Sequence, residues 1–238
     1  MAKVVGIFGF SGDGKTTSTI INPDGSIDLS PEGYKGIDPK SHGILNVDMK
    51  SLPFPAALTK QWCGANKNYR ETCDMDIIIK TLKAWAQDPN IKSCGVDTIN
   101  SYITYKEMLE RRKMTFDQWK DMAIDVVDLI NTANVILRED QICYIFGHVE
   151  MITDVDGNDR KVLATSGKKL KKVFPESMFP IVLFTRVEPG LEGENKYYFE
   201  TRANHSSGKT PLGMFKDFLI PNSLKLVDQT IREYYDMK

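Results

Sequence analysis

The segment GFSGDGKT at residues 9–16 constrains this chain more than any other feature of its sequence. It satisfies the whole pattern G-x-x-x-x-G-K-S/T and follows an apolar run, residues 4–8, that suits a strand buried on both faces of a parallel sheet. In such a loop, backbone N–H groups curl around phosphate oxygens, the lysine reaches the terminal phosphates, and the threonine hydroxyl binds magnesium. The segment therefore predicts an α/β fold with a phosphate-binding loop between its first strand and its first helix.

Eight residues of this region are expected to contact a nucleotide. They are Gly9, Ser11, Gly12, Asp13, Gly14, Lys15, Thr16 and Thr17. Lys15 is also expected to act in catalysis, and Thr16 to bind Mg²⁺. The alternative is a glycine-rich turn that carries a lysine without a ligand. ATP is favoured over GTP because the sequence has no Asn-Lys-x-Asp segment that would read guanine.

Size and charge favour one α/β domain over residues 1–238, since a chain of 238 residues can bury a substantial core. The 31 Lys and Arg balance 32 Asp and Glu, so a polyanionic partner would need a local basic patch. The four cysteines have no C-x-x-C spacing, which favours a reduced, cytoplasmic setting. No signal stretch precedes the first strand and no apolar run approaches about 20 residues, so we expect neither secretion nor membrane insertion.

Apolar periodicity divides the rest of the chain into helices and strands. Helices are expected at residues 16–21, at residues 74–87, and from Thr115 to Ala133, where Thr115 and Gln118 form a capping box. Strands are expected at residues 44–47, 93–97, 142–148, 151–153, 161–164, 181–187 and 196–201. Residues 22–43 are expected to form an irregular insertion, and residues 150–175 a hairpin and a basic loop. This order predicts a mostly parallel central sheet flanked by helices, with an antiparallel C-terminal extension.

Polar side chains end several predicted strands, at the sheet edge where ligands of α/β proteins gather. Asp97 is expected to hold Mg²⁺ through water, or alternatively to cap the next helix. Asp48 is a candidate general base, or an ordinary turn aspartate. His148 is a candidate sensor of the γ-phosphate, although a lone histidine at a strand end is more often structural. Glu150 is a second candidate for orienting the attacking water.

Cationic residues in the second half suggest contacts with other molecules. A basic cluster, a candidate site for single-stranded DNA or else a solvated positive face, comprises Lys168, Lys169, Lys171 and Lys172. Arg202 and Lys209 follow the last predicted strand. In a ring or filament either one is a candidate for reaching the γ-phosphate held by a neighbouring subunit; otherwise each is a surface cation. Residues 154–159 look like a calcium loop but lack the flanking helices and the terminal glutamate, so a hairpin turn is expected.

Taken in order, these motifs resemble the phage-encoded RecA-like P-loop ATPases of the Sak type, a phage AAA-domain family. The matching segments are GFSGDGKTT at 9–17, GVDT at 95–98, FGHVE at 146–150, GKK at 167–169, and TRA at 201–203 running to Lys209 and Thr210. The resemblance implies a RecA-like core, ATP hydrolysis, and a role in phage recombination or replication beside single-strand annealing or single-strand-binding proteins in the host cytoplasm. It also implies single-stranded DNA as a ligand and self-assembly. The 22–43 insertion departs from the family pattern, as does Asp48 where RecA-like enzymes commonly carry glutamate, so the base stays open.

The sequence thus predicts a RecA-like ATPase that uses ATP and Mg²⁺, with turnover stimulated by DNA. A small-molecule or nucleotide kinase is the first alternative, in which Arg111 and Arg112 would belong to a lid over the acceptor. A non-catalytic, ATP-dependent adaptor is the second. The three readings differ in where the γ-phosphate goes: to water, to an acceptor, or nowhere.

Overall fold

The computed structural model describes residues 3–30, 32–109, 116–153, 157–165, 175–190 and 194–237, and within them the side chains of all but residues 109, 116–121 and 123. The strands are β1 (Lys3–Gly9), β2 (His42–Asn46), β3 (Tyr69–Glu71), β4 (Ser93–Asp97), β5 (Ile142–Thr153), β6 (Asp159–Leu163), β7 (Ile181–Pro189), β8 (Asn195–Glu200) and β9 (Leu219–Pro221). The α-helices are α1 (Ala56–Thr59), α2 (Met75–Gln87), α3 (Ile99–Leu109), α4 (Phe116–Ile136) and α6 (Leu224–Tyr234). Short 3₁₀ turns are η1 (Thr16–Thr19), η2 (Gly64–Asn66) and η3 (Pro175–Met178).

The strands form one mixed sheet in the order β3-β2-β4-β5-β1-β7-β8-β9, with β6 paired to β5. The pairs from β3 to β7 along this order are parallel, whereas β7–β8, β8–β9 and β5–β6 are antiparallel. The mostly parallel sheet and the antiparallel C-terminal strands confirm the α/β class predicted from the sequence. The order also places β5 between the phosphate-loop strand β1 and the Asp97 strand β4.

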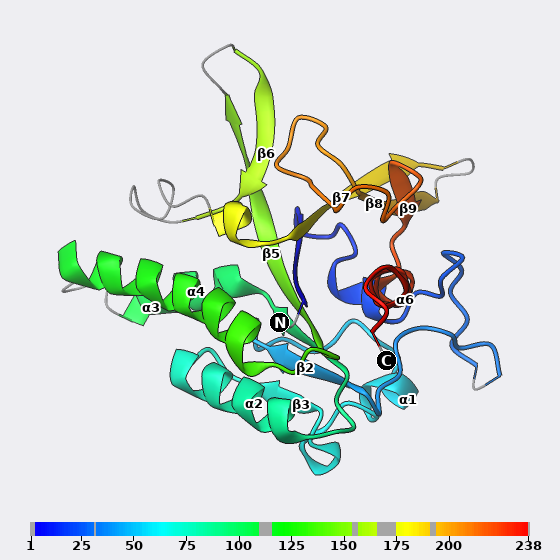
Figure 1. Cartoon of the computed structure of the whole chain (residues 1–238), viewed down its shortest axis with the longest axis horizontal. Helices are drawn as coiled ribbons and strands as arrows, with labels where there is room; N and C mark the ends of the chain where they lie inside the picture. The colour runs from blue at the N-terminus through cyan, green and yellow to red at the C-terminus, as the bar shows by residue number, and fades with distance from the viewer. Residues whose placement is uncertain are drawn as a thin grey trace.

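Helices cover both faces of the sheet (Figure 1). On one face, α2, α3 and α4 pack against alternate strand residues such as Val4 and Phe8, while on the other α1 and α6 pack against Val5 and Ile7. Both sets of β1 residues are buried, which explains why this strand is a continuous apolar run. The β5–β6 ribbon projects away from this layered body in Figure 1.

Several predicted elements are confirmed. Helix α2 begins after Asp74, whose Oδ1 accepts hydrogen bonds from the backbone N–H groups of Asp76 and Ile77 and so caps the helix. Strand β4 has the bounds predicted, and the predicted hairpin exists between β5 and β6. The two strands predicted at residues 142–148 and 151–153 are one continuous strand, β5. Helix α4 is present, but Thr115 and the side chain of Gln118, the predicted capping box, lie outside what the structure describes.

The first predicted helix is wrong in type, because residues 16–19 form a 3₁₀ turn in place of an α-helix over residues 16–21. The Ser18 hydroxyl donates to the carbonyl of Lys15, competing for a backbone acceptor, and the chain turns at Asn22, whose carbonyl accepts from the N–H of Gly25. The next strand also begins earlier than expected, at His42. Buried His42 contacts the Ser93 hydroxyl through Nδ1 at 2.8 Å, and burial lowers its pKa to about 3. A neutral, satisfied histidine therefore opens β2.

Five helices and strands had no counterpart in the sequence prediction: α1, β3, α3, β9 and α6. Ser223 caps α6 by accepting from the N–H of Leu226, and Leu224, Val227 and Ile231 bury one face of the helix against the sheet. The spacing of these three apolar residues by three and four positions is typical of an amphipathic helix and could have predicted α6 from the sequence. No helix in the described part of the chain is both long and apolar enough to cross a membrane.

Candidate functional site

The candidate site lies at the carboxyl edge of the parallel strands. Gly9, the last residue of β1, stands in register with His148 of β5, and Asn46 of β2 stands in register with Asp97 of β4. Parallel strands end on the same side of a sheet, so the loop after β1 and these residues share one edge. The topology thus assembles residues from four separate parts of the chain.

The phosphate loop is braced by its own aspartate. Asp13 Oδ2 accepts hydrogen bonds from the backbone N–H of Phe10 at 2.9 Å and from the Thr185 hydroxyl at 2.7 Å. Gly12 and Gly14 have φ of 88° and 79°, the left-handed region that suits glycine. The structure therefore gives the Asp13 carboxylate a role in shaping the loop, although the sequence had placed it among the nucleotide contacts.

Lys15 is buried at the centre of the loop. Its Nζ donates to the carbonyls of Gly9 at 2.8 Å and Phe10 at 2.7 Å, and it lies 3.3 Å from Nδ1 of His148. Burial lowers the pKa of Lys15, while the carboxylates of Asp13, Asp97 and Asp48 raise it. No carboxylate is within ion-pair distance of Lys15 among the described residues, so its positive charge is available to an anion.

Asp97 is the one predicted metal-binding carboxylate, and it contacts the loop directly. Thr16 Oγ1 donates to Asp97 Oδ2 at 2.5 Å. The other oxygen, Oδ1, is buried and has no hydrogen-bond partner among the described residues. Burial is the main reason that the pKa of Asp97 rises to about 6, and the Thr16 hydrogen bond opposes it. An unpartnered buried carboxylate oxygen is costly unless a ligand occupies it.

These donors fit Mg²⁺. The ion typically uses one or two protein carboxylates and completes an octahedron with water and substrate phosphates. The hydroxyl of Thr16 and the free oxygen of Asp97 supply hard oxygen ligands beside the loop. No cluster of three or more His, Cys, Asp or Glu residues able to hold a metal occurs in the described residues.

One carboxylate oxygen of Asp48, Oδ1, is held by three hydrogen bonds. Its Oδ1 accepts from the backbone N–H of Thr98 at 2.9 Å, from the Thr98 hydroxyl at 2.7 Å, and from the Ser101 hydroxyl at 2.5 Å. Burial acts to raise the pKa of Asp48, but these hydrogen bonds outweigh it and the pKa is lowered. Its Oδ2 lies 3.8 Å from Nζ of Lys50. Asp48 therefore anchors the start of α3 through Oδ1, and only Oδ2 is left for a ligand.

His148 and Glu150, both on β5, have different surroundings. Burial and the nearby Lys15 lower the pKa of His148, so its neutral ring can accept from the Lys15 ammonium. Glu150 lies two residues further on, where its Oε1 accepts from the backbone N–H of Thr165 at 3.4 Å. It lines a different pocket, with Leu163 and Glu176, and not the one beside the loop. The structure brings His148 to the phosphate loop but leaves Glu150 apart from it.

The late cations also lie apart from the loop of their own chain. The backbone at Lys209 pairs with Val182, which stands beside Gly6 in the middle of β1. Arg202 donates to the carbonyl of Lys216, and Lys209 Nζ to the carbonyl of Ser177. Neither lines the pocket beside the loop of its own chain. The basic cluster Lys168, Lys169, Lys171 and Lys172 lies outside the described residues, as do Arg111 and Arg112.

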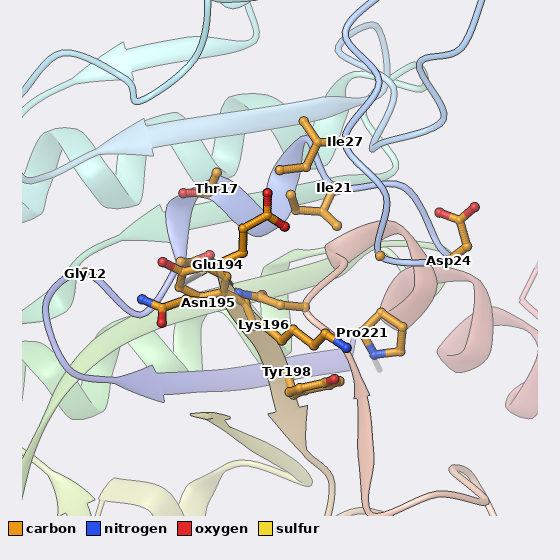
Figure 2. A pocket seen from close by; sticks show the side chains of 14 residues that line it. Gly12, Thr17, Ile21, Asp24, Ile27, Glu194, Asn195, Lys196, Tyr198 and Pro221 are labelled. Carbon is orange, nitrogen blue, oxygen red and sulfur yellow. Dashed lines mark hydrogen bonds between the residues drawn. The ribbon is translucent and has the colours of Figure 1, made fainter. Parts of the chain in front are cut away.

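Two pockets adjoin the phosphate loop. One of about 300 Å³ is lined by Lys15, Thr16, Asp48, Lys50, Asp97 and His148, together with Ser11 and the glycines of the loop. The other, of about 580 Å³, lies between residues 17–27, which follow the loop, and strands β8 and β9. Figure 2 shows Thr17, Ile21 and Ile27 on one side of it and Lys196, Tyr198 and Pro221 on the other. Only the first of these pockets could be expected from the sequence, because β9 and the residue after it carry no local motif.

No protein-family model matches the chain, and no curated protein matches it.

Proposed function

We propose that this chain is a RecA-like P-loop ATPase that hydrolyses ATP to ADP and phosphate. One observation carries the proposal: Thr16 of the phosphate loop is hydrogen-bonded to Asp97, and the second oxygen of Asp97 is left without a partner beside buried Lys15. A phosphate cradle and an oxygen site for a divalent cation are what binding of a nucleoside triphosphate with Mg²⁺ requires. The position of β5 between β1 and β4 supports the proposal, since it sets His148 against Lys15.

Each residue then has a definable task. Backbone N–H groups of the loop and Lys15 hold the phosphates, and Lys15 exchanges the carbonyls of Gly9 and Phe10 for phosphate oxygens. Thr16 and Asp97 would hold Mg²⁺, which when bound neutralises charge on the phosphates. His148 is released from Lys15 by that exchange and becomes free to contact the γ-phosphate. This is a route by which His148 would sense nucleotide state.

Water must be oriented for in-line attack on the γ-phosphate, and Asp48 is the acidic residue best placed to do so. It lines the same pocket as Lys15 and Asp97, whereas Glu150 does not. Its lowered pKa makes it a weak base, so it would orient water through Oδ2 more than remove a proton early. Phosphoryl transfer depends mainly on positioning and charge neutralisation, and it tolerates a weak base of this kind.

We also propose that ATP turnover serves recombination or replication of phage DNA, with single-stranded DNA as a ligand, an annealing or single-strand-binding protein as partner, and a homo-oligomer as the working form. The support is the set of motifs that resemble the Sak-type ATPases and the location of Arg202 and Lys209 away from their own chain's loop. A cation that contacts the nucleotide of a neighbouring subunit must lie away from the phosphate loop of its own chain.

The test is steady-state phosphate release from ATP and Mg²⁺, with and without single-stranded DNA, for the wild type and Lys15→Ala. Turnover that DNA stimulates, and that the variant reduces on the order of 10²-fold or more, is expected because the main cation facing the phosphates is removed. Lys83→Ala is the control, since Lys83 is an exposed lysine on α2 that lines neither pocket beside the loop. Phosphate appearing on an acceptor would show a kinase, and tight binding without turnover would show an adaptor.

A further inference from the structure

The larger pocket beside the phosphate loop holds a buried hydrogen-bond acceptor with nothing to accept. Asn222 is 2% exposed and lines this pocket. Its Nδ2 donates to the carbonyls of Asp13 at 3.3 Å and Gly14 at 3.2 Å, while its Oδ1 has no partner in the described part of the structure. Exchanging the two amide atoms would set Oδ1 against two carbonyl oxygens, so the orientation is fixed by the loop itself. Asn222 Oδ1 is therefore a buried acceptor for which the described residues provide no donor.

The charges around this pocket disfavour a polyanion. Asp24 and Glu194 line it, with Lys196 as the only cation among its lining residues. The smaller pocket suits phosphate better, because Lys15 and Lys50 balance Asp48 and Asp97 there, and the free oxygen of Asp97 could hold a cation that accompanies the phosphates. Phosphates thus belong on the side of Lys15, and an uncharged group belongs on the side of Asn222.

The walls suit a flat, partly apolar group attached to phosphate. Ile21, Ile27 and Pro221 contribute apolar surface, and the volume of about 580 Å³ falls within the range of small-molecule sites (Figure 2). Tyr197 and Asn222 both lie against Gly14: a side-chain carbon placed on Gly14 would come within 3.2 Å of the Tyr197 ring and 2.6 Å of Asn222 Nδ2. The pocket therefore opens directly beside the phosphate-binding backbone.

We propose that this pocket binds the nucleoside of the nucleotide, with Asn222 Oδ1 accepting a hydrogen bond from a donor on that nucleoside and Tyr197 contacting it with its ring. The donor is either a sugar hydroxyl or the exocyclic amino group of the base, since both are neutral donors. The proposal rests on the proposed function, because the phosphates must sit on the loop. It deepens that function by assigning nucleoside recognition to residues far from the loop in sequence.

The experiment compares ligands that share the phosphates but differ in the nucleoside. Dissociation constants are measured with Mg²⁺ for ATP, 2′,3′-dideoxy-ATP, inosine triphosphate and inorganic tripolyphosphate. The proteins are the wild type, Asn222→Ala, Tyr197→Ala, Tyr197→Phe and the control Asn204→Ala, which makes the same change at an exposed turn. The wild type is expected to bind ATP at least tenfold more tightly than tripolyphosphate.

Asn222→Ala removes the two hydrogen bonds to the loop as well as Oδ1, so it is expected to weaken ATP roughly threefold to tenfold more than it weakens tripolyphosphate, the usual effect of one further lost hydrogen bond. Tyr197→Ala should act in the same selective way, and Tyr197→Phe should not. If the donor is a sugar hydroxyl, the wild type should bind dideoxy-ATP more weakly than ATP, by the extra factor that Asn222→Ala costs ATP. If the donor is the amino group, the wild type should instead bind inosine triphosphate more weakly than ATP by that factor. Asn222→Ala should then weaken that analogue no more than it weakens tripolyphosphate.

Three results would overturn the proposal. The first is tripolyphosphate binding the wild type as tightly as ATP, and the second is Asn222→Ala weakening ATP and tripolyphosphate equally. The third is Asn222→Ala weakening dideoxy-ATP and inosine triphosphate both as much as it weakens ATP. The second of these would mean that Asn222 only braces the loop through its two carbonyls. If neither ATP nor tripolyphosphate bound the wild type, the proposed function itself would fail, which is a different result from selective failure of the nucleoside site.

Discussion

Thr16 and Asp97, which are 81 residues apart in the sequence, are joined by a hydrogen bond of 2.5 Å between Thr16 Oγ1 and Asp97 Oδ2. The contact links the phosphate loop to the end of β4 across the intervening strand β5. It also leaves Asp97 Oδ1 buried without a partner among the described residues, in a carboxyl group whose pKa is raised to about 6. The folded protein thus carries an unfavourable charge that a bound cation would offset.

Asp97→Asn is therefore expected to stabilise the ligand-free protein at pH 7.5 while removing Mg²⁺-dependent turnover. A rise in pKa from 3.8 to about 6 corresponds to roughly 3 kcal/mol of cost for the ionised form. Some of this gain is lost because the new amide N–H also lacks a partner, so a net gain of roughly 1–2 kcal/mol is expected. Urea unfolding without nucleotide or Mg²⁺ measures it. A variant less stable than the wild type at pH 7.5 would contradict the burial argument.

The same carboxyl sets a pH dependence. Because the folded pKa lies above the unfolded one, the folded state binds more protons between about pH 4 and pH 6, and the stability contributed by Asp97 falls as pH rises through this window. The advantage of Asp97→Asn over the wild type should therefore shrink as pH falls and disappear at about pH 5, because the unpartnered amide still counts against the variant when Asp97 is protonated. Mg²⁺ should stabilise the wild type above pH 6 and have no such effect on the variant. A pH-independent difference would show that another property of the amide is responsible.

Asp48→Asn and Asp48→Ala should separate anchoring from water orientation. Alanine leaves the N–H of Thr98 and the hydroxyl of Ser101 without their acceptor, and is expected to cost roughly 2–4 kcal/mol of unfolding free energy. Asparagine keeps an acceptor oxygen and should cost about 1 kcal/mol. If Oδ2 orients water, Asp48→Asn should still reduce turnover roughly 10²-fold.

The control for Asp48 is Asp38→Asn, because Asp38 is exposed and caps a local turn by accepting from the N–H of Lys40. Phosphate release and urea unfolding on the same samples provide both readouts. Full turnover in a stable Asp48→Asn protein would limit Asp48 to anchoring the start of α3.

Gly14→Ala and Gly12→Ala form a matched pair, since both residues have positive φ. A side-chain carbon at Gly12 meets nothing within 4 Å, so only the left-handed backbone opposes it, at about 1 kcal/mol. At Gly14 the same carbon lies 2.6 Å from Nδ2 of Asn222, which must move and abandon two carbonyls. Gly14→Ala should therefore lose roughly 2–3 kcal/mol of unfolding free energy in urea. Equal losses at the two sites would contradict the packing of Asn222 against the loop.

Arg138→Lys should destabilise the protein although the charge is kept. The guanidinium donates to the carbonyls of Ala86, Asp88 and Ile91 and to the carboxylate of Asp140, and so holds the end of α2 beside β4. A lysine ammonium lacks the planar fork and cannot reach all of these acceptors. A loss of roughly 2–3 kcal/mol is expected in thermal or urea unfolding. Arg160→Lys, on an exposed residue, should change stability by less than about 0.5 kcal/mol.

Local pattern was enough to predict much of the sheet and the edge that carries the candidate site. The apolar runs of β1, β4, β5 and β7 are buried on both faces, and Asp97 at the end of β4 and His148 opposite the end of β1 could be assigned to one edge because parallel strands run in the same direction, although β5 continues to Thr153. Where polar residues sit in a strand, the pattern failed: buried His42 hid the start of β2, since its satisfied ring looks no different in sequence from a loop histidine.

The sequence by itself determined the parallel core, and it pointed to the loop of residues 9–16 and to the candidate metal ligands, because each depends on residues close together or on the common direction of the strands. Only the tertiary structure decided which carboxylates face the loop, separating Asp48 from Glu150, and only it revealed Asn222, whose partner carbonyls at Asp13 and Gly14 are 209 and 208 residues away. Contacts across such distances depend on how the C-terminal strands fold back onto the sheet. Local propensity and spacing carry no information about that packing.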